Sequence, residues 1–316
     1  MARRTLSEGM MGPGLIQISR EMKSQSPVFI VGEARSGTSV LYRTLQKHTT
    51  FAPKTIDLTE TEIFALLHRV FMFRARYPEQ LLKFMLRDRD RWTEFLRSIR
   101  PCRVMNGILV PINLLIRRPP RWLWCANLHH LTLRSFFWHA SEARRCLRLV
   151  EKTPTNTPHL RHLKHAFPHG RFLYVHRHPV DVFASYRRRA QNDPGAKWAD
   201  IGIEDFCDRY DRSTSVVLAW LDAGAVDLLM VGYENFTSDP ETSFREICRF
   251  LDVRFEQEAL IERDPDSRRW RGDPLLWGPI VTTPGLWRDH VSQTEASSIE
   301  SRLAPLMSRL GYAPYA

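Results

Sequence analysis

The sequence predicts an α/β fold in which a parallel sheet is flanked by helices on both faces. Short apolar runs, typical of buried strands, alternate along the chain with segments whose apolar residues recur at helical spacing. That alternation favours a parallel sheet. With 316 residues, of which 43% are hydrophobic, the chain can form one large core with an appended lid. We therefore expect a single domain over residues 27–316, preceded by a loose N-terminal arm over residues 1–26.

The expected strands and helices follow one another in a regular order. The apolar runs predict strands over Val28–Val31, Leu147–Val150, Arg171–His176 and Leu228–Val231. Between them we expect a helix carrying Val40, Leu41, Thr44 and Leu45, a turn over Thr153–Pro158 with a helix to Phe167, and a helix opened by Pro179. After the last strand we expect an amphipathic helix over Thr242–Leu251 and a helix that ends at Leu310.

Residues 59–145 interrupt this alternation. The first part is helical in pattern and rich in Arg, Phe and Leu, and the second interleaves proline, tryptophan and arginine. We interpret the stretch as a helical insertion that forms a lid or one wall of a ligand pocket. An ordinary aromatic core explains the same pattern equally well.

The chain is basic and carries no sign of a metal site. Its net charge of +11 and pI near 9.8 suit a polyanionic ligand or an anionic membrane surface. No RNA- or DNA-binding signature accompanies the charge, so we expect no nucleic-acid partner. The spacing of the five cysteines supports neither a disulfide framework nor zinc binding, and we expect buried free thiols. The cysteines are Cys102, Cys125, Cys146, Cys207 and Cys248.

The N-terminal residues lack the apolar core of a signal peptide, and no stretch reaches the ~18 apolar residues needed to span a bilayer. We therefore expect a cytoplasmic protein, for which peripheral contact with a membrane is compatible with the basic charge.

A glycine loop over residues 32–39 carries the strongest chemical signal. Gly32 and Gly37 allow a tight turn and close approach of a ligand, and the amides that follow open a helix. Unpaired amides and the helix dipole make such an end a phosphate site. The glycine spacing is that of the P-loop of nucleotide hydrolases, but Thr38 occupies its lysine position and Arg35 supplies a cation earlier. This departure disfavours ATP or GTP hydrolysis, and an ordinary strand–helix turn is the alternative.

A second phosphate-binding pattern lies at Arg177 and Ser185. Arg177 ends a strand, and Ser185 lies eight residues later, about two turns into the next helix. If that helix folds back over the strand end, the guanidinium and the hydroxyl can meet one phosphate.

With both patterns present, the chain resembles the sulfotransferases that use 3′-phosphoadenosine 5′-phosphosulfate (PAPS), most closely their bacterial and tyrosyl-protein branch. The loop Glu33-Ala34-Arg35-Ser36-Gly37-Thr38-Ser39 is similar to the family's 5′-phosphosulfate loop, with Ala34 in place of its usual proline. Arg177 and Ser185 match the pair that holds the 3′-phosphate, and Lys152 matches the lysine of a lysine-proline element. Further similarities lie at Tyr233-Glu234, at Gly285–His290 and at the ending Leu310-Gly311-Tyr312.

The resemblance implies a P-loop-like fold, PAPS as co-substrate, no metal, and in-line transfer of a sulfuryl group to a hydroxyl or an amine. Residues 59–145 then lie on the acceptor side. The implied nucleotide-binding residues are Arg35, Ser36, Gly37, Thr38, Ser39, Arg177, Ser185, Tyr233, Arg269 and Gly272.

For catalysis we expect Arg35 to stabilise charge on the leaving phosphate and Lys152 to stabilise charge and donate a proton. We favour Glu60 as the base that takes the acceptor proton. Four other side chains stay open as the base: Glu62, Asp57, His129 and His130. The acceptor is a lipid, a glycan, a peptide or a small molecule. Two rival functions are a P-loop-like kinase or nucleotide hydrolase and a non-catalytic nucleotide-binding protein.

Overall fold

The computed structural model of the chain describes residues 26–52, 147–261, 280 and 286–315. The expected insertion over residues 59–145 and almost all of the N-terminal arm lie outside the described residues. The α/β prediction is confirmed over the residues that are described.

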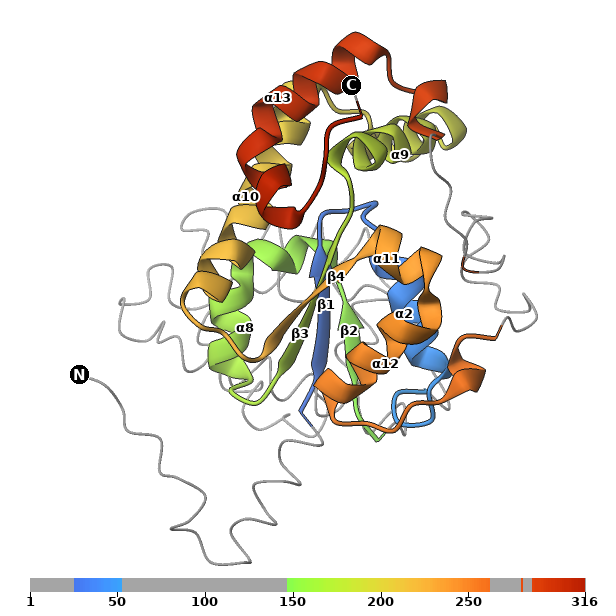
Figure 1. Cartoon of the computed structure of the whole chain (residues 1–316), viewed down its shortest axis with the longest axis vertical. Coiled ribbons are helices and arrows are strands. Elements are labelled where there is room, and N and C mark those ends of the chain that lie inside the picture. The colour runs from blue at the N-terminus through green and yellow to red at the C-terminus, as the bar shows by residue number, and fades with distance from the viewer. Residues whose placement is uncertain (1–25, 53–146, 262–279, 281–285, 316) are drawn as a thin grey trace, which may run out of the picture.

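The centre of the fold is a parallel sheet of four strands in the order β2-β1-β3-β4 (Figure 1). The strands are β1 (Val28–Gly32), β2 (Val150–Lys152), β3 (Arg171–His176) and β4 (Leu228–Gly232). Because all four run in the same direction, their carboxyl ends meet at one edge of the sheet, where ligands bind in open α/β folds.

Strand β2 starts later than the sequence predicts. Leu147 is 73% exposed, and the residues that pair with β1 are Val150, Glu151 and Lys152. The two polar residues are fully buried in the strand, so a search for apolar runs finds only its beginning. The other three predicted strands agree with the structure to within one residue.

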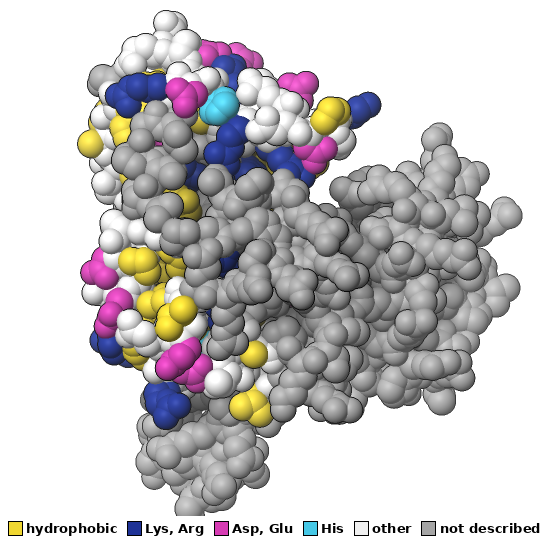
Figure 2. Space-filling view, turned by 90° about the vertical axis from the view of Figure 1, so that its right-hand side faces the viewer, with side chains coloured by type: hydrophobic (Ala, Val, Ile, Leu, Met, Phe, Trp, Pro, Cys, Tyr) yellow, Lys and Arg dark blue, Asp and Glu magenta, His cyan; other side chains and the backbone are white. Residues whose placement is uncertain are grey.

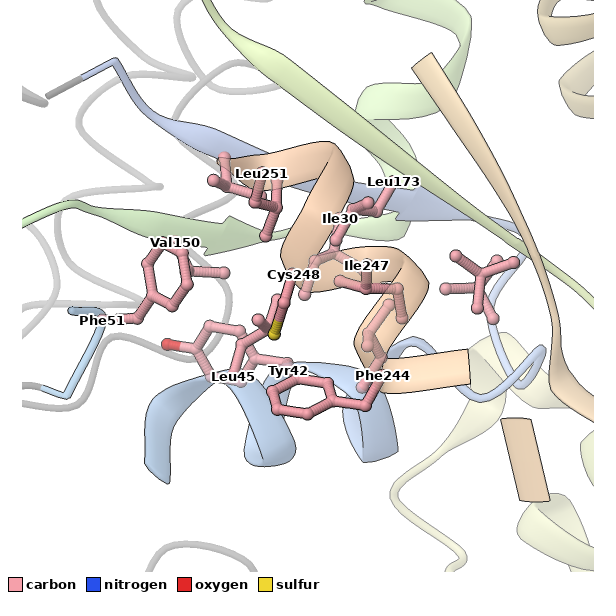
Figure 3. Packing of buried hydrophobic residues seen from close by; sticks show 14 of the residues in the cluster. Ile30, Tyr42, Leu45, Phe51, Val150, Leu173, Phe244, Ile247, Cys248 and Leu251 are labelled. Atoms are coloured by element: carbon pink, nitrogen blue, oxygen red, sulfur yellow. The ribbon is translucent and has the colours of Figure 1, made fainter. Parts of the chain in front are cut away.

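Helices cover both faces of the sheet, as Figure 1 shows. On one face lie α2 (Thr38–Lys47) and α12 (Pro240–Leu251), and on the other lie α8 (Leu160–Ala166) and α10 (Ile203–Asp222). Side chains alternate along each strand, so Ile30 and Leu173 enter the first core. Phe29 and Phe172 lie on the opposite face, where their ring centroids are 5.3 Å apart and Phe172 contacts Trp220 of α10. Figure 3 shows how Tyr42 and Leu45 of α2 and Phe244, Ile247 and Cys248 of α12 fill the first core.

A further helical layer lies above the carboxyl ends of the strands (Figure 1). It contains α9 (Pro179–Asn192) and α13 (Gln293–Leu310), which pack on the first half of α10 around a second core. A capping box begins α13, since Ser292 and Glu295 bond each other's backbone amides. The short elements are η3 (Pro154–His159), η4 (Lys197–Ala199), α11 (Tyr233–Ser238), η5 (Gln257–Ala259) and η8 (Leu286–Asp289).

Helix α10 is the largest described element without a sequence prediction. Its buried residues recur at helical spacing, so the signal was present: Phe206, Cys207, Tyr210, Ser213, Thr214, Val217 and Leu218. Ser213 and Thr214 interrupt the apolar stripe with hydroxyls, which hides it from a hydrophobicity criterion.

The structure describes two of the five cysteines. Cys207 and Cys248 are free and buried, and the other three cysteines lie outside the described residues. In the part of the chain that the structure describes, no helix is both long and apolar enough to cross a membrane. Figure 2 shows Lys and Arg side chains gathered, beside acidic ones, over the upper part of the face it draws.

Candidate functional site

The loop between β1 and α2 is held by two side chains, Thr157 and Tyr233, that lie close to its glycine backbone. Thr157 Oγ1 accepts a hydrogen bond from the Gly32 amide at 2.9 Å and donates one to the Gly32 carbonyl at 3.2 Å. Gly37 has a φ of 97°, and a Cβ placed there would lie 2.2 Å from a carbon of the Tyr233 ring. Gly37 is the N-cap of α2, so the glycine brings the start of the helix against Tyr233. Only glycine fits this contact.

Arg35 connects the two phosphate-binding patterns. Its Nε donates a hydrogen bond to Ser185 Oγ at 3.1 Å, across 150 residues of sequence. The Arg35 backbone has a φ of 69°, a left-handed conformation that is uncommon outside glycine and that turns the loop at this residue. The structure therefore brings the loop and α9 together at Ser185.

Lys152 lies at the carboxyl end of β2 beside the first turn of α2. Its side chain is only 1% exposed, and its Nζ donates to Ser39 Oγ at 3.1 Å. The neighbouring Glu151 accepts hydrogen bonds from Thr153 and from the amide of Asn156. Lys152 is thus directed at the loop end of α2, next to the residues that the sequence assigns to the phosphosulfate.

Arg177 follows β3 on the opposite side of the loop. Its guanidinium carbon lies 4.4 Å from the centre of the Tyr233 ring, and its carbonyl accepts from the Tyr210 hydroxyl at 2.8 Å. Burial raises the pKa of Tyr210, so this phenol stays protonated and remains a donor. Tyr233 therefore touches both Gly37 and Arg177, which links the two halves of the site.

Two buried polar atoms in this region have no hydrogen-bond partner among the described residues: Ser36 Oγ and Arg177 Nε. Buried polar groups are nearly always hydrogen-bonded, and unsatisfied ones are costly. Both belong to residues that the sequence assigns to phosphate binding. A phosphate or sulfate oxygen is an acceptor that either could donate to.

The segment around Arg177 is fixed by long-range tethers. Glu234 accepts from the His178 amide at 2.8 Å and from the Tyr312 hydroxyl at 2.9 Å. Tyr312 also bonds His176 Nδ1 at 2.8 Å, and the His178 ring stacks on Tyr315 at 3.7 Å. Burial lowers the pKa of His176 to about 4, so this ring is neutral near pH 7.

A third cluster surrounds Glu33, just before Arg35. Its carboxylate accepts from the hydroxyl of Tyr186, from the guanidinium of Arg209 and from the hydroxyl of Ser213. These residues belong to α9 and α10 and appear in no motif. Hydroxyls and an arginine at helical spacing are too common to identify the cluster from sequence.

The predicted site residues divide into two groups. The structure brings Arg35, Ser36, Gly37, Thr38, Ser39, Lys152, Arg177, Ser185 and Tyr233 to the carboxyl edge of the sheet. Glu60 and the other candidate bases lie outside the described residues, as do Arg269 and Gly272. Among the described residues, no group of His, Cys, Asp and Glu side chains could hold a metal ion.

Comparison with known proteins identifies the family and the fold. The model of a family described as "Sulfotransferase family" matches residues 27–257. The sulfotransferase domain of an olefin synthase from Synechococcus PCC 7002 superposes with a TM-score of 0.54 at 20% identity, over 92% of this chain and 96% of that one. A sulfotransferase domain from the curacin biosynthetic pathway gives 0.53 at 17% identity, over 92% and 98%. At these identities the likeness shows the fold. No curated protein matches the chain.

Proposed function

The chain belongs to the sulfotransferase family, whose model covers residues 27–257, and we propose that it moves a sulfuryl group from PAPS to a hydroxyl or amine of its acceptor. Sulfuryl transfer is the chemistry of the family. The choice of donor is our inference from the site. PAPS carries anionic groups at both ends of its ribose, and the chain has two phosphate-binding patterns that lie side by side.

The contact between Arg35 Nε and Ser185 Oγ carries this proposal. It joins the loop after β1 to the helix after β3, so one ligand with two anionic groups can span both. The unpartnered Ser36 Oγ and Arg177 Nε support it, because each supplies a hydrogen-bond donor at one of the two anionic positions. A nucleoside triphosphate has no second anionic group at the ribose 3′ position.

In the proposed complex the amides and hydroxyls of residues 36–39 bind the 5′-phosphosulfate. Arg177 and Ser185 bind the 3′-phosphate, and Tyr233 lies between the two sites. Arg269 and Gly272 are proposed to cover the 3′-phosphate. Lys152, with its ammonium already at Ser39, is the group nearest to where charge develops on the leaving phosphate.

The reaction breaks one bond to sulfur and forms another. The acceptor oxygen or nitrogen bonds to sulfur and loses its proton to a base, while the bond between sulfur and the bridging oxygen breaks. The products are the sulfated acceptor and adenosine 3′,5′-bisphosphate. Arg35 and Lys152 stabilise the charge on the departing phosphate, and Glu60 is proposed as the base. Glu62, Asp57, His129 and His130 remain the alternatives to Glu60.

Thermal denaturation with nucleotides tests the donor. Adenosine 3′,5′-bisphosphate should raise the melting temperature, and ATP with Mg²⁺ should not, because Thr38 stands where hydrolases have lysine. A strong Mg²⁺-dependent shift with ATP and none with the bisphosphate contradicts the proposal. Transfer of labelled sulfate from PAPS to lipid, glycan, peptide and phenolic acceptors then identifies the acceptor class.

A further inference from the structure

A buried carboxylate lies at the beginning of the phosphate loop. The side chain of Glu33 is 8% exposed. Its Oε1 accepts from the Tyr186 hydroxyl at 2.6 Å and from Arg209 Nη2 at 3.3 Å, and its Oε2 accepts from Ser213 Oγ at 3.4 Å. An acidic side chain at an anion site repels the ligand unless its charge is compensated. The structure compensates it with Arg209.

The hydroxyl of Tyr186 bonds both members of the Glu33–Arg209 pair. Burial and the neighbouring Glu33 raise its pKa, so the hydroxyl keeps its proton and donates to the carboxylate. The same oxygen accepts from Arg209 Nη2 at 3.0 Å. One nitrogen of the guanidinium is therefore held by two oxygens whose own positions are fixed by α9 and by the loop.

Within the described part of the chain, the hydrogen bonds of the Arg209 guanidinium all involve Nη2. The side chain is 38% exposed, and neither Nη1 nor Nε has a hydrogen-bond partner among the described residues. An arginine has five N–H donors in a rigid plane, so fixing one nitrogen orients the others.

Arg209 lies on the flank of the loop where the reaction is proposed. Helix α10 packs against η3, the element that follows Lys152 and that holds Gly32 through Thr157. Arg177, in contrast, lies against Tyr233, at the end of β4. Arg209 therefore approaches the beginning of the loop, and Arg177 serves the other end of the nucleotide.

We propose that Arg209 is a further basic residue of the donor site, and that its exposed N–H groups bind the oxygens of the sulfuryl group during transfer. Glu33 and Tyr186 are its positioning residues. The inference rests on the proposed function, because it takes PAPS as the donor. A cation that is already in place stabilises charge without reorganising at the moment of reaction.

The decisive experiment compares two ligands that differ only in the sulfuryl group. Equilibrium binding of PAPS, without acceptor, and of adenosine 3′,5′-bisphosphate is measured for the wild type and for Arg209→Ala. We expect affinity for PAPS to fall about tenfold, as for the loss of one charge-assisted bond, and affinity for the bisphosphate to change less than about twofold. Arg212→Ala, an exposed arginine of the same helix, is the matched control and should change neither.

Glu33→Gln tests the positioning role without removing Arg209. It keeps the side-chain shape and removes the charge that holds the guanidinium, so we expect the same selective loss for PAPS, about threefold, with a native far-UV spectrum. Equal losses for both ligands in Arg209→Ala, or no loss for PAPS, overturn the inference. If Arg209→Ala does not fold, Arg209→Gln removes the charge but keeps a polar side chain, and the same selective loss for PAPS is expected. Failure of the wild type to bind either ligand overturns the proposed function instead and is seen before any variant is made.

Discussion

The two ends of the proposed nucleotide site are built differently. The loop after β1 takes its shape from its own backbone, with Gly37 at a φ of 97° and Arg35 at 69°. The segment after β3 takes its position from other parts of the chain, since Glu234, Tyr312 and Tyr315 all hold residues 176–178. A motif can encode the first kind of site, whereas the second depends on the assembled fold. A single substitution in the loop should therefore reduce nucleotide affinity strongly. Residues 176–178, which we call the tethered segment, should lose affinity or stability only a little with each contact that is removed.

Gly37→Ala should have the largest effect. The left-handed backbone costs roughly 1–2 kcal/mol for a residue with a Cβ, and the contact with Tyr233 adds about 1–3 kcal/mol of overpacking. We expect affinity for adenosine 3′,5′-bisphosphate to fall by about a hundredfold or more in calorimetry. Gly224→Ala is the matched control, because Gly224 also has a positive φ but nothing within 4 Å. Similar losses in both variants would show that the Tyr233 contact is unimportant.

Lys152→Met tests whether Lys152 stabilises the charge on the leaving phosphate. Methionine keeps much of the buried volume but removes the charge that meets Ser39. We expect turnover to fall by about a hundredfold, with affinity for the bisphosphate changed less than about threefold, because the charge acts mainly in the transition state. Steady-state kinetics at saturating PAPS provide the measurement. Near-full turnover would leave Arg35 as the group that stabilises the leaving phosphate.

Arg177→Ala and Ser185→Ala test whether the segment after β3 and helix α9 share one phosphate. Each should weaken binding of the bisphosphate by about 1.5–3 kcal/mol, the cost of a charge-assisted hydrogen bond. The double variant should lose clearly less than the sum of the two, since both groups bind the same phosphate. Strict additivity in titration calorimetry would place them at separate sites.

The tethered segment should also respond to pH. The pKa of His176 is about 4 in the folded protein and about 6.5 when unfolded, so the unfolded chain binds more protons in between. The contribution of His176 to the free energy of unfolding is thus present above pH 6.5 and is lost as pH falls, by about 1.6 kcal/mol between pH 6.5 and pH 5. Urea denaturation at both values measures the loss, and His176→Gln should reduce it.

Glu295 provides an internal reference for that experiment. Hydrogen bonds from Arg187 hold the pKa of Glu295 at about 2, so its contribution is lost only as pH falls below about 4.5. An unchanged pH dependence in His176→Gln would assign the transition to another group.

The smallest effect is expected for Tyr312→Phe. The change removes the hydroxyl that bonds both Glu234 and His176, which should cost about 1 kcal/mol of stability and weaken bisphosphate binding a few-fold. Tyr315→Phe is its control, because the ring that stacks on His178 is kept and only a bond to Asp181 is lost. A larger effect of Tyr315→Phe would move the main tether from Glu234 to the bond between the Tyr315 hydroxyl and Asp181.

The sequence predicts the parts of this molecule whose determinants are local. Apolar runs located β1, β3 and β4, and Pro179 marked the start of α9. The loop residues and the Arg177–Ser185 pair were identified from spacing. The contact between Glu33 and Arg209 was not predictable, because 176 residues separate the two and neither side chain belongs to a periodic pattern. The tethers from Tyr312 and Tyr315 were missed for the same reason, although the ending around Tyr312 was recognised.

The strand order has a consequence for how the chain acquires its structure. Val28 of β1 pairs with Val150 of β2 on one side and with Arg171 of β3 on the other, and among the described residues of the sheet neither partner is closer than 122 residues in sequence. During synthesis at roughly 5–20 residues per second, the apolar segment of β1 therefore waits roughly 6–24 seconds before its first neighbour, β2, has been synthesised. Such non-local pairing slows folding and leaves an unpaired hydrophobic strand exposed to other chains in the meantime. The yield of folded protein should accordingly depend on expression temperature and on chaperone supply. The stability of the folded protein, once formed, should matter less for this yield.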